Sequence, residues 1–219
     1  MVKRPVIVFD MDGVLVDSIP FHYKSLRKLF AGYGIKYSFD EYKRHDITAG
    51  AMNVIPRVFR AHGGNPANIQ DALKKKNRLS LNVQIPLFPG VLELIKNLKK
   101  KGYTLAVASG GTRYFVTRRL KKNRIYKYFD FIITGDDHVR KKPHPGIYLK
   151  TAKEFKVHPA DCVVIEDSYD GVLAAKRAGM KVIGHKVPIE EQDLSRADFA
   201  VDSMTDINLK LILKVWKKE

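Results

Sequence analysis

The sequence predicts an α/β protein, in which a parallel β-sheet flanked by helices is interrupted by an all-helical insertion. Three observations predict it. The run Pro5–Phe9 is short, apolar and β-branched, which is typical of a buried strand. Residues 18–82 carry apolar side chains at helical spacing and contain no convincing strand. After Pro86, strand-like and helix-like segments alternate, a pattern that favours parallel strands joined by right-handed crossovers.

The alternation can be followed element by element, and Gly102 and Gly179 each end a predicted helix. Thr112 is expected to cap the helix that it begins. We therefore expect two domains, a core formed by 1–17 with 83–219 and an insertion at 18–82. The expected strands are 103–108, 129–133, 163–165, 181–184 and an edge strand at 199–201, and the expected helices are 91–101, 112–122, 145–155, 168–178 and a terminal one.

Composition limits the function classes. The chain of 219 residues carries a net charge of +17, but its basic clusters fall mostly on separate predicted helices. We read them as solvated faces, so no specific nucleic-acid partner is expected. No apolar run is long enough to cross a membrane, and the single Cys162 has no second cysteine to pair with. We expect a soluble cytoplasmic protein, monomeric or dimeric.

Polar residues follow the predicted strands at their carboxyl ends, where parallel sheets bind ligands. The first strand leads into Asp10 and Asp12, two carboxylates on one side of an extended chain, followed by Gly13. A hard cation such as Mg²⁺ would relieve their repulsion. For this motif alone, an acidic strand end exposed to water is an equally good interpretation.

Later strands end in complementary groups. Ser109 and Gly110 begin a loop before a helix, where a hydroxyl and free backbone N–H groups can hold a phosphate. Lys142 precedes a proline and could neutralise phosphate charge, while Glu166 and Asp167 could supply further metal ligands. Each feature alone could be a helix cap or a solvated loop, but together they indicate one site.

These motifs, in this order, resemble those of the haloacid dehalogenase-like hydrolase superfamily. The closest resemblance is to its β-phosphoglucomutase-like and phosphoglycolate-phosphatase-like branch. It covers about 1–20 and 84–205, and the insertion matches the position of that branch's helical cap domain. The motifs are Asp10-x-Asp12-Gly-Val-Leu-Val-Asp17-Ser18, Ser109, Lys142-Pro143-x-Pro145, and Glu166-Asp167-Ser168 followed by Gly171-Val-x-Ala-Ala-x-x-Ala-Gly179-Met180.

The resemblance implies a Rossmann-like core and a role for each matching residue. Asp10 would be the nucleophile that forms an aspartyl-phosphate, and Asp12 the general acid and base. Lys142 would steady the developing charge, and Ser109 with Gly110 would hold the phosphoryl group. Mg²⁺ would be held by the Asp10 carboxylate, the Asp12 backbone carbonyl, Asp167 and, directly or through water, Glu166.

The sequence departs from the family pattern at two positions. Lys141 stands where a glycine is common, and Gly146 where an acidic residue is common. Because Lys141 and Lys142 are adjacent, Pro143 decides the assignment in favour of Lys142. These departures leave the substrate preference open.

The expected activity is a phosphatase acting on a small phosphorylated metabolite. A phosphomutase of the β-phosphoglucomutase type is the alternative, since both use the same core. A dehalogenase is disfavoured because its chemistry needs no metal, whereas Asp12, Glu166 and Asp167 could supply metal ligands. A non-catalytic phosphoacceptor module is disfavoured because it would lack the helical insertion. A nucleic-acid-binding module is disfavoured by the scattered charge. The cap residues His22, Thr48, Asn53 and Arg57 are candidate substrate contacts, although a surface role suits each of them better.

Overall fold

The fold separates into two compact units in a computed structural model that describes residues 4–47, 49–187 and 192–217. The core unit comprises the chain up to Asp17 and from Pro86 onward, and the helical unit comprises Ser18–Ile85. The helical unit thus ends at Ile85, whereas the sequence predicts that the insertion ends at residue 82.

The core unit is built on one parallel sheet of six strands in the order β3-β2-β1-β4-β5-β6, which confirms the predicted fold class. The first strand therefore lies in the interior of the sheet, and its four residues are all buried. The strands are β1 (Val6–Phe9), β2 (Leu105–Ala108), β3 (Phe131–Ile133), β4 (Cys162–Glu166), β5 (Lys181–His185) and β6 (Phe199–Val201).

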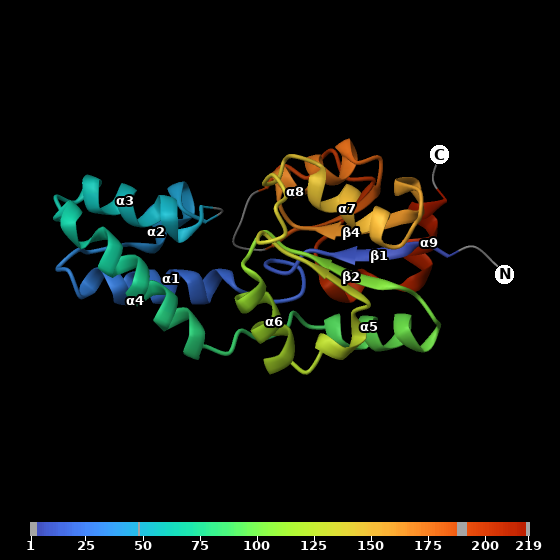
Figure 1. Ribbon diagram of the computed structural model, residues 1–219, viewed down its shortest axis with the longest axis horizontal. Helices are drawn as coiled ribbons and strands as arrows, with labels where there is room; N and C mark the ends of the chain where they lie inside the picture. Colours follow the sequence, from blue (N-terminus) through green and yellow to red (C-terminus); the bar gives the residue numbers. More distant parts are fainter. Residues whose placement is uncertain (1–3, 48, 188–191, 218–219) are drawn as a thin grey trace. The chain divides into compact units, whose positions relative to one another are not determined.

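Helices cover both faces of this sheet. Figure 1 shows α5 and α6 on one side and α7 and α8 on the other. Alternation along β1 explains the two layers, since Val6 and Val8 join the apolar cluster that contains Ile147 and Tyr148 of α7. The helices are α5 (Val91–Lys100), α6 (Arg113–Lys122), α7 (Gly146–Glu154), α8 (Tyr169–Arg177) and α9 (Leu209–Trp216).

The cap of α6 differs from the prediction. Thr112 occupies the N-cap position, but its side chain makes no capping hydrogen bond in the described structure. Instead, the Asp136 carboxylate accepts a hydrogen bond of 2.8 Å from the Arg113 backbone N–H. A carboxylate suits a helix N-terminus because the helix dipole is positive there.

The helical unit contains α1 (Ile19–Ala31), α2 (Phe39–His45), α3 (Ala51–Ala61) and α4 (Ile69–Asn82), and no strand occurs among its described residues. Amphipathic spacing predicts its core, since Leu26, Leu29 and Phe30 of α1 are buried, as are Val58 and Phe59 of α3.

The two ends of the insertion leave the core unit side by side. The Asp17 backbone N–H donates to the Pro86 carbonyl at 3.0 Å, and Val16 forms an antiparallel bridge with Leu87. The Phe88 N–H completes the link by donating to the Leu15 carbonyl at 3.2 Å.

Candidate active site

The carboxyl ends of three adjacent strands bring the predicted polar residues to one edge of the sheet. In the register of β1, Phe9 lies beside both Val107 of β2 and Ile165 of β4, so the residues that follow are neighbours. The Asp10 N–H donates to the Ile165 carbonyl at 3.0 Å, which holds Asp10 at the strand end. Asp10, Ser109, Glu166 and Asp167 are all buried.

Lys142 joins the strand ends from the loop before α7. Its Nζ lies 2.5 Å from Asp10 Oδ1, 2.5 Å from Glu166 Oε1 and 3.2 Å from the Ala108 carbonyl. Burial by itself lowers the pKa of Lys142, but the Asp10 and Glu166 carboxylates outweigh it and raise that pKa well above its usual value. The lysine is therefore a fixed positive charge beside Asp10.

Asp10 has an environment that opposes its ionisation. The pKa of Asp10 is raised to about 7. Burial is the largest cause, the attraction of Lys142 opposes it, and the nearby Glu166 and Asp12 charges add to it. One lysine thus does not offset the acidic groups gathered here. A divalent cation would supply the missing positive charge.

Glu166 is held by hydrogen bonds to both of its oxygens. Oε1 accepts from Lys142 and from the Tyr148 hydroxyl at 2.7 Å, while Oε2 accepts from the Asp167 N–H at 3.0 Å and the Ser168 hydroxyl at 3.1 Å. Burial would raise the pKa of Glu166, but Lys142, the Tyr148 hydroxyl and the Ser168 backbone N–H lower it. Glu166 is thus an ionised carboxylate that anchors Lys142. The sequence did not point to Tyr148, because an aromatic residue in a helix usually belongs to the apolar core.

Asp167 lies directly against the turn that follows β1. A Cβ atom on Gly13 would overlap the Asp167 carboxylate and lie 3.1 Å from the Asp167 Cβ, and Gly13 has φ +79°. The absent side chain therefore makes room for Asp167 beside the Asp12–Gly13 backbone.

This donor set fits Mg²⁺. Among the described residues, no three His, Cys, Asp or Glu side chains form a ready-made metal cluster. Mg²⁺ does not need one, because it binds through one or two carboxylates, with waters and substrate oxygens completing its shell. Asp10 and Asp167 would provide the carboxylates, and the Asp12–Gly13 turn lies against Asp167.

Ser109 and Gly110 form the first part of the loop between β2 and α6. Ser109 is buried, and its Oγ accepts a hydrogen bond from the Gly111 N–H at 3.1 Å. Gly110 is exposed, with no atom within 4 Å of the position that a Cβ would take. The loop thus leaves space beside Gly110, ahead of α6.

Asp12 forms an ion pair with Arg119, one of the basic residues that the sequence predicted to lie on a solvated face. Arg119 Nη1 in α6 donates to Asp12 Oδ1 at 2.7 Å. Helical periodicity places Arg119 beside Val116 and Leu120, which are buried in α6, but it does not reveal Asp12 as the partner. Because α6 is rich in Arg and Lys, nothing in the sequence separates Arg119 from the neighbouring solvated residues.

The candidate contacts in the helical unit have varied surroundings. His22 is half-buried in α1, and Asn53 is exposed in α3. The Arg57 guanidinium binds Asp46 through two hydrogen bonds and Glu41 Oε1 at 3.0 Å. Thr48 lies outside the described residues.

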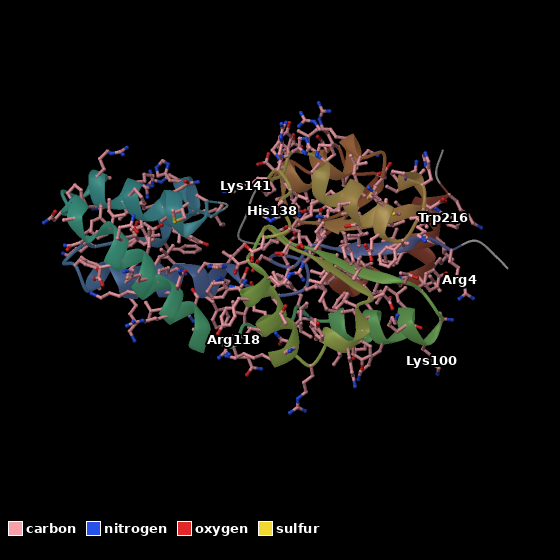
Figure 2. All side chains as sticks on the ribbon, viewed as in Figure 1. Arg4, Lys100, Arg118, His138, Lys141 and Trp216 are labelled. Carbon is pink, nitrogen blue, oxygen red and sulfur yellow. The ribbon has the colours of Figure 1, made fainter. Side chains whose placement is uncertain are left out.

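Basic side chains are distributed over many elements of the core unit. Figure 2 shows Arg4 before β1, Lys100 at the end of α5, Arg118 in α6 and Lys141 in the loop before α7. These labelled side chains lie at separate places on the core unit, as the sequence pattern indicated.

Comparisons with known proteins agree with this geometry. The family model "Haloacid dehalogenase-like hydrolase" matches residues 7–185. A "Phosphorylated carbohydrates phosphatase" of Thermotoga maritima is 33% identical over 184 residues, covering 81% of this chain and 82% of that protein. "Protein CbbY" of Cereibacter sphaeroides is 32% identical over 213 residues, covering 92% of this chain and 93% of the relative.

The fold is shared with a solved structure of the same kind. A CbbY variant from Rhodobacter sphaeroides, solved in complex with xylulose-(1,5)bisphosphate, has a TM-score of 0.81 and 29% identity, covering 97% of this chain and 99% of that one. The motif residues thus stand at the strand ends of a sheet that these proteins share. Since the family model spans most of the chain and the two relatives, at 32% and 33% identity, cover 92% and 81% of it, the chain belongs to the haloacid dehalogenase-like hydrolases.

Proposed function

We propose that this protein is a Mg²⁺-dependent phosphatase that hydrolyses a small phosphorylated metabolite through an aspartyl-phosphate on Asp10. The observation that carries the proposal is the buried Asp10 carboxylate at the end of an interior strand, with Lys142 Nζ 2.5 Å from Oδ1. An anionic nucleophile can approach an anionic phosphate only where cations offset the repulsion. The relative named for phosphorylated carbohydrates and the CbbY variant solved with xylulose-(1,5)bisphosphate support this substrate class.

The reaction divides into two displacements. An Asp10 carboxylate oxygen attacks phosphorus, which forms one P–O bond and breaks the ester P–O bond, while Asp12 gives a proton to the leaving oxygen. Asp12 then takes a proton from water, which attacks phosphorus, releases inorganic phosphate and restores Asp10. Ser109 and the Gly110 N–H hold the phosphoryl oxygens, and Lys142 stabilises their negative charge.

The proposed metal ligands are the carboxylates of Asp10 and Asp167 and the backbone carbonyl of Asp12. Glu166 would act through water, because its oxygens already accept hydrogen bonds from Lys142, Tyr148 and the Ser168 hydroxyl. A bound Mg²⁺ would offset charge on the nucleophile and the phosphoryl oxygens.

We further propose that the enzyme acts in the cytoplasm on a free metabolite, without a specific nucleic-acid partner. The distribution of basic side chains over separate elements and the single Cys162 support this. Within the part of the chain that the structure describes, no helix is long and apolar enough to cross a bilayer. A monomer or dimer stays a prediction.

The test measures inorganic phosphate released from a panel of sugar and alkyl phosphates, with Mg²⁺ and with chelator. We expect Mg²⁺-dependent turnover that Asp10→Asn lowers by about 10³-fold or more, because the nucleophile is lost. Asp40→Asn, the same chemical change at an exposed position of α2, should leave turnover unchanged. Full activity of Asp10→Asn, or of the chelated enzyme, would refute the proposal. Isomerised hexose phosphate in place of free phosphate would identify a mutase instead.

A further inference from the structure

The ion pair between Arg119 and Asp12 joins two parts of the chain that are 107 residues apart. Arg119 Nη1 lies 2.7 Å from Asp12 Oδ1, and the exposed fractions of the two side chains are 12% and 36%. An arginine so largely withdrawn from water differs from the flexible surface pairs that contribute little. The contact thus has a defined geometry.

Helix α6 gives Arg119 a rigid support. The Asp136 carboxylate caps the Arg113 N–H at the start of the helix, and Val116 and Leu120 are buried on either side of Arg119 in the sequence. The helix also follows directly on the Ser109 loop, which is part of the same site. A side chain anchored on a packed helix can hold its partner more accurately than one on a loop.

We propose that Arg119 is a positioning residue for Asp12. This inference rests on the proposed function, in which Asp12 transfers protons to and from reacting oxygens. Asp12 comes after the end of β1, where it is only half-buried, so its side chain needs an anchor to stay within hydrogen-bond reach of those oxygens. The guanidinium supplies that anchor through Oδ1.

The role makes a prediction that depends on the leaving group. Loss of a placed general acid slows esters whose leaving oxygen needs a proton, such as alkyl phosphates. It hardly affects 2,4-dinitrophenyl phosphate, whose leaving phenolate is stable without one. The ratio kcat/KM reports the first displacement alone, so it isolates proton donation from later water activation.

The experiment compares Arg119→Met with the wild type on both kinds of ester. We expect kcat/KM to fall about 10- to 100-fold for the alkyl phosphate and by less than about threefold for 2,4-dinitrophenyl phosphate. In an Asp12→Asn background, Arg119→Met should cause no further loss with either ester. Arg119→Lys should restore part of the loss. Lys121→Met, which removes one positive charge from an exposed position of the same helix, should match the wild type.

The outcomes separate this inference from the proposed function. Equal losses on the two esters would overturn the positioning role and assign Arg119 to phosphoryl binding or to the fold. Unchanged kinetics, or a further loss in the Asp12→Asn background, would overturn it as well. If Arg119→Met does not fold, Arg119→Gln and Arg119→Lys provide the same comparison of esters. A wild type without phosphatase activity on the whole panel would instead refute the proposed function, and this role with it.

Discussion

Gly13 offers a sharp test of the site, because the space above its Cα is taken by Asp167. In Gly13→Ala, the new methyl group would overlap the Asp167 carboxylate, and the backbone would have to keep φ +79° with a Cβ present. The backbone cost alone is about 1–2 kcal/mol. The overlap adds a second effect, since the Asp167 carboxylate must leave its position.

Gly34→Ala is the matched control. Gly34 has a similar φ of +73°, and nothing lies within 4 Å of its would-be Cβ. It should therefore pay the backbone cost without a clash, which for a chain of this size lowers Tm by about 2–4 °C per kcal/mol. Activity of this variant should equal that of the wild type.

Gly13→Ala should in addition lose function. We expect turnover to fall by about 10²-fold, because a displacement of 1 Å in a site has effects of that size. The Mg²⁺ concentration for half-maximal activity should rise by about tenfold or more. Thermal unfolding and Mg²⁺ titration of phosphate release measure both. A Gly13→Ala enzyme with normal Mg²⁺ dependence would show that Asp167 is not a metal ligand.

Two further predictions concern charge. Burial raises the pKa of Asp10 to about 7, so between about pH 4 and pH 7 the folded metal-free protein binds a proton that the unfolded chain has released. The free energy of unfolding, measured by urea titration in chelator, should thus fall as the pH rises through this range. Asp10→Asn should make this dependence on pH weaker. An equal dependence on pH in the variant and the wild type would contradict the prediction. Arg57→Met removes the counter-charge of the buried Asp46, so it should lower stability by about 2 kcal/mol, less than a fully buried pair would lose because Arg57 is partly exposed. Altered KM ratios between substrates at unchanged Tm would instead assign Arg57 to substrate binding.

The sequence was most informative about features that depend on local patterns along the chain or on the order of the strands. Alternating strand and helix patterns predict the parallel sheet, and the rule for parallel strand ends then places Asp10, Ser109 and Glu166 at one edge. The structure has this sheet, and its register brings those positions together. Strand lengths were less well predicted, because the outer residues of a short strand depend on which neighbour they pair with.

Contacts between distant segments were beyond sequence reasoning. The Asp136 carboxylate caps α6 where Thr112 was expected to do so, since a partner from another loop is invisible in the local pattern. Arg119 was hidden among neighbouring basic residues, and its partner Asp12 is known only once α6 is packed on the sheet. The local pattern also does not reveal the partner of Arg57, which is the buried Asp46 carboxylate at the end of α2.

The paired exits of the insertion have a consequence for the evolution of such proteins. Because Asp17 and Pro86 are hydrogen bonded to each other, the core already brings together the two points between which the insertion is threaded. The entropy of closing a loop between fixed ends grows only slowly with its length. A lineage can therefore lengthen, shorten or exchange the helical segment while the sheet and its catalytic edge stay intact, so that new substrate preferences can be tried without rebuilding the chemistry.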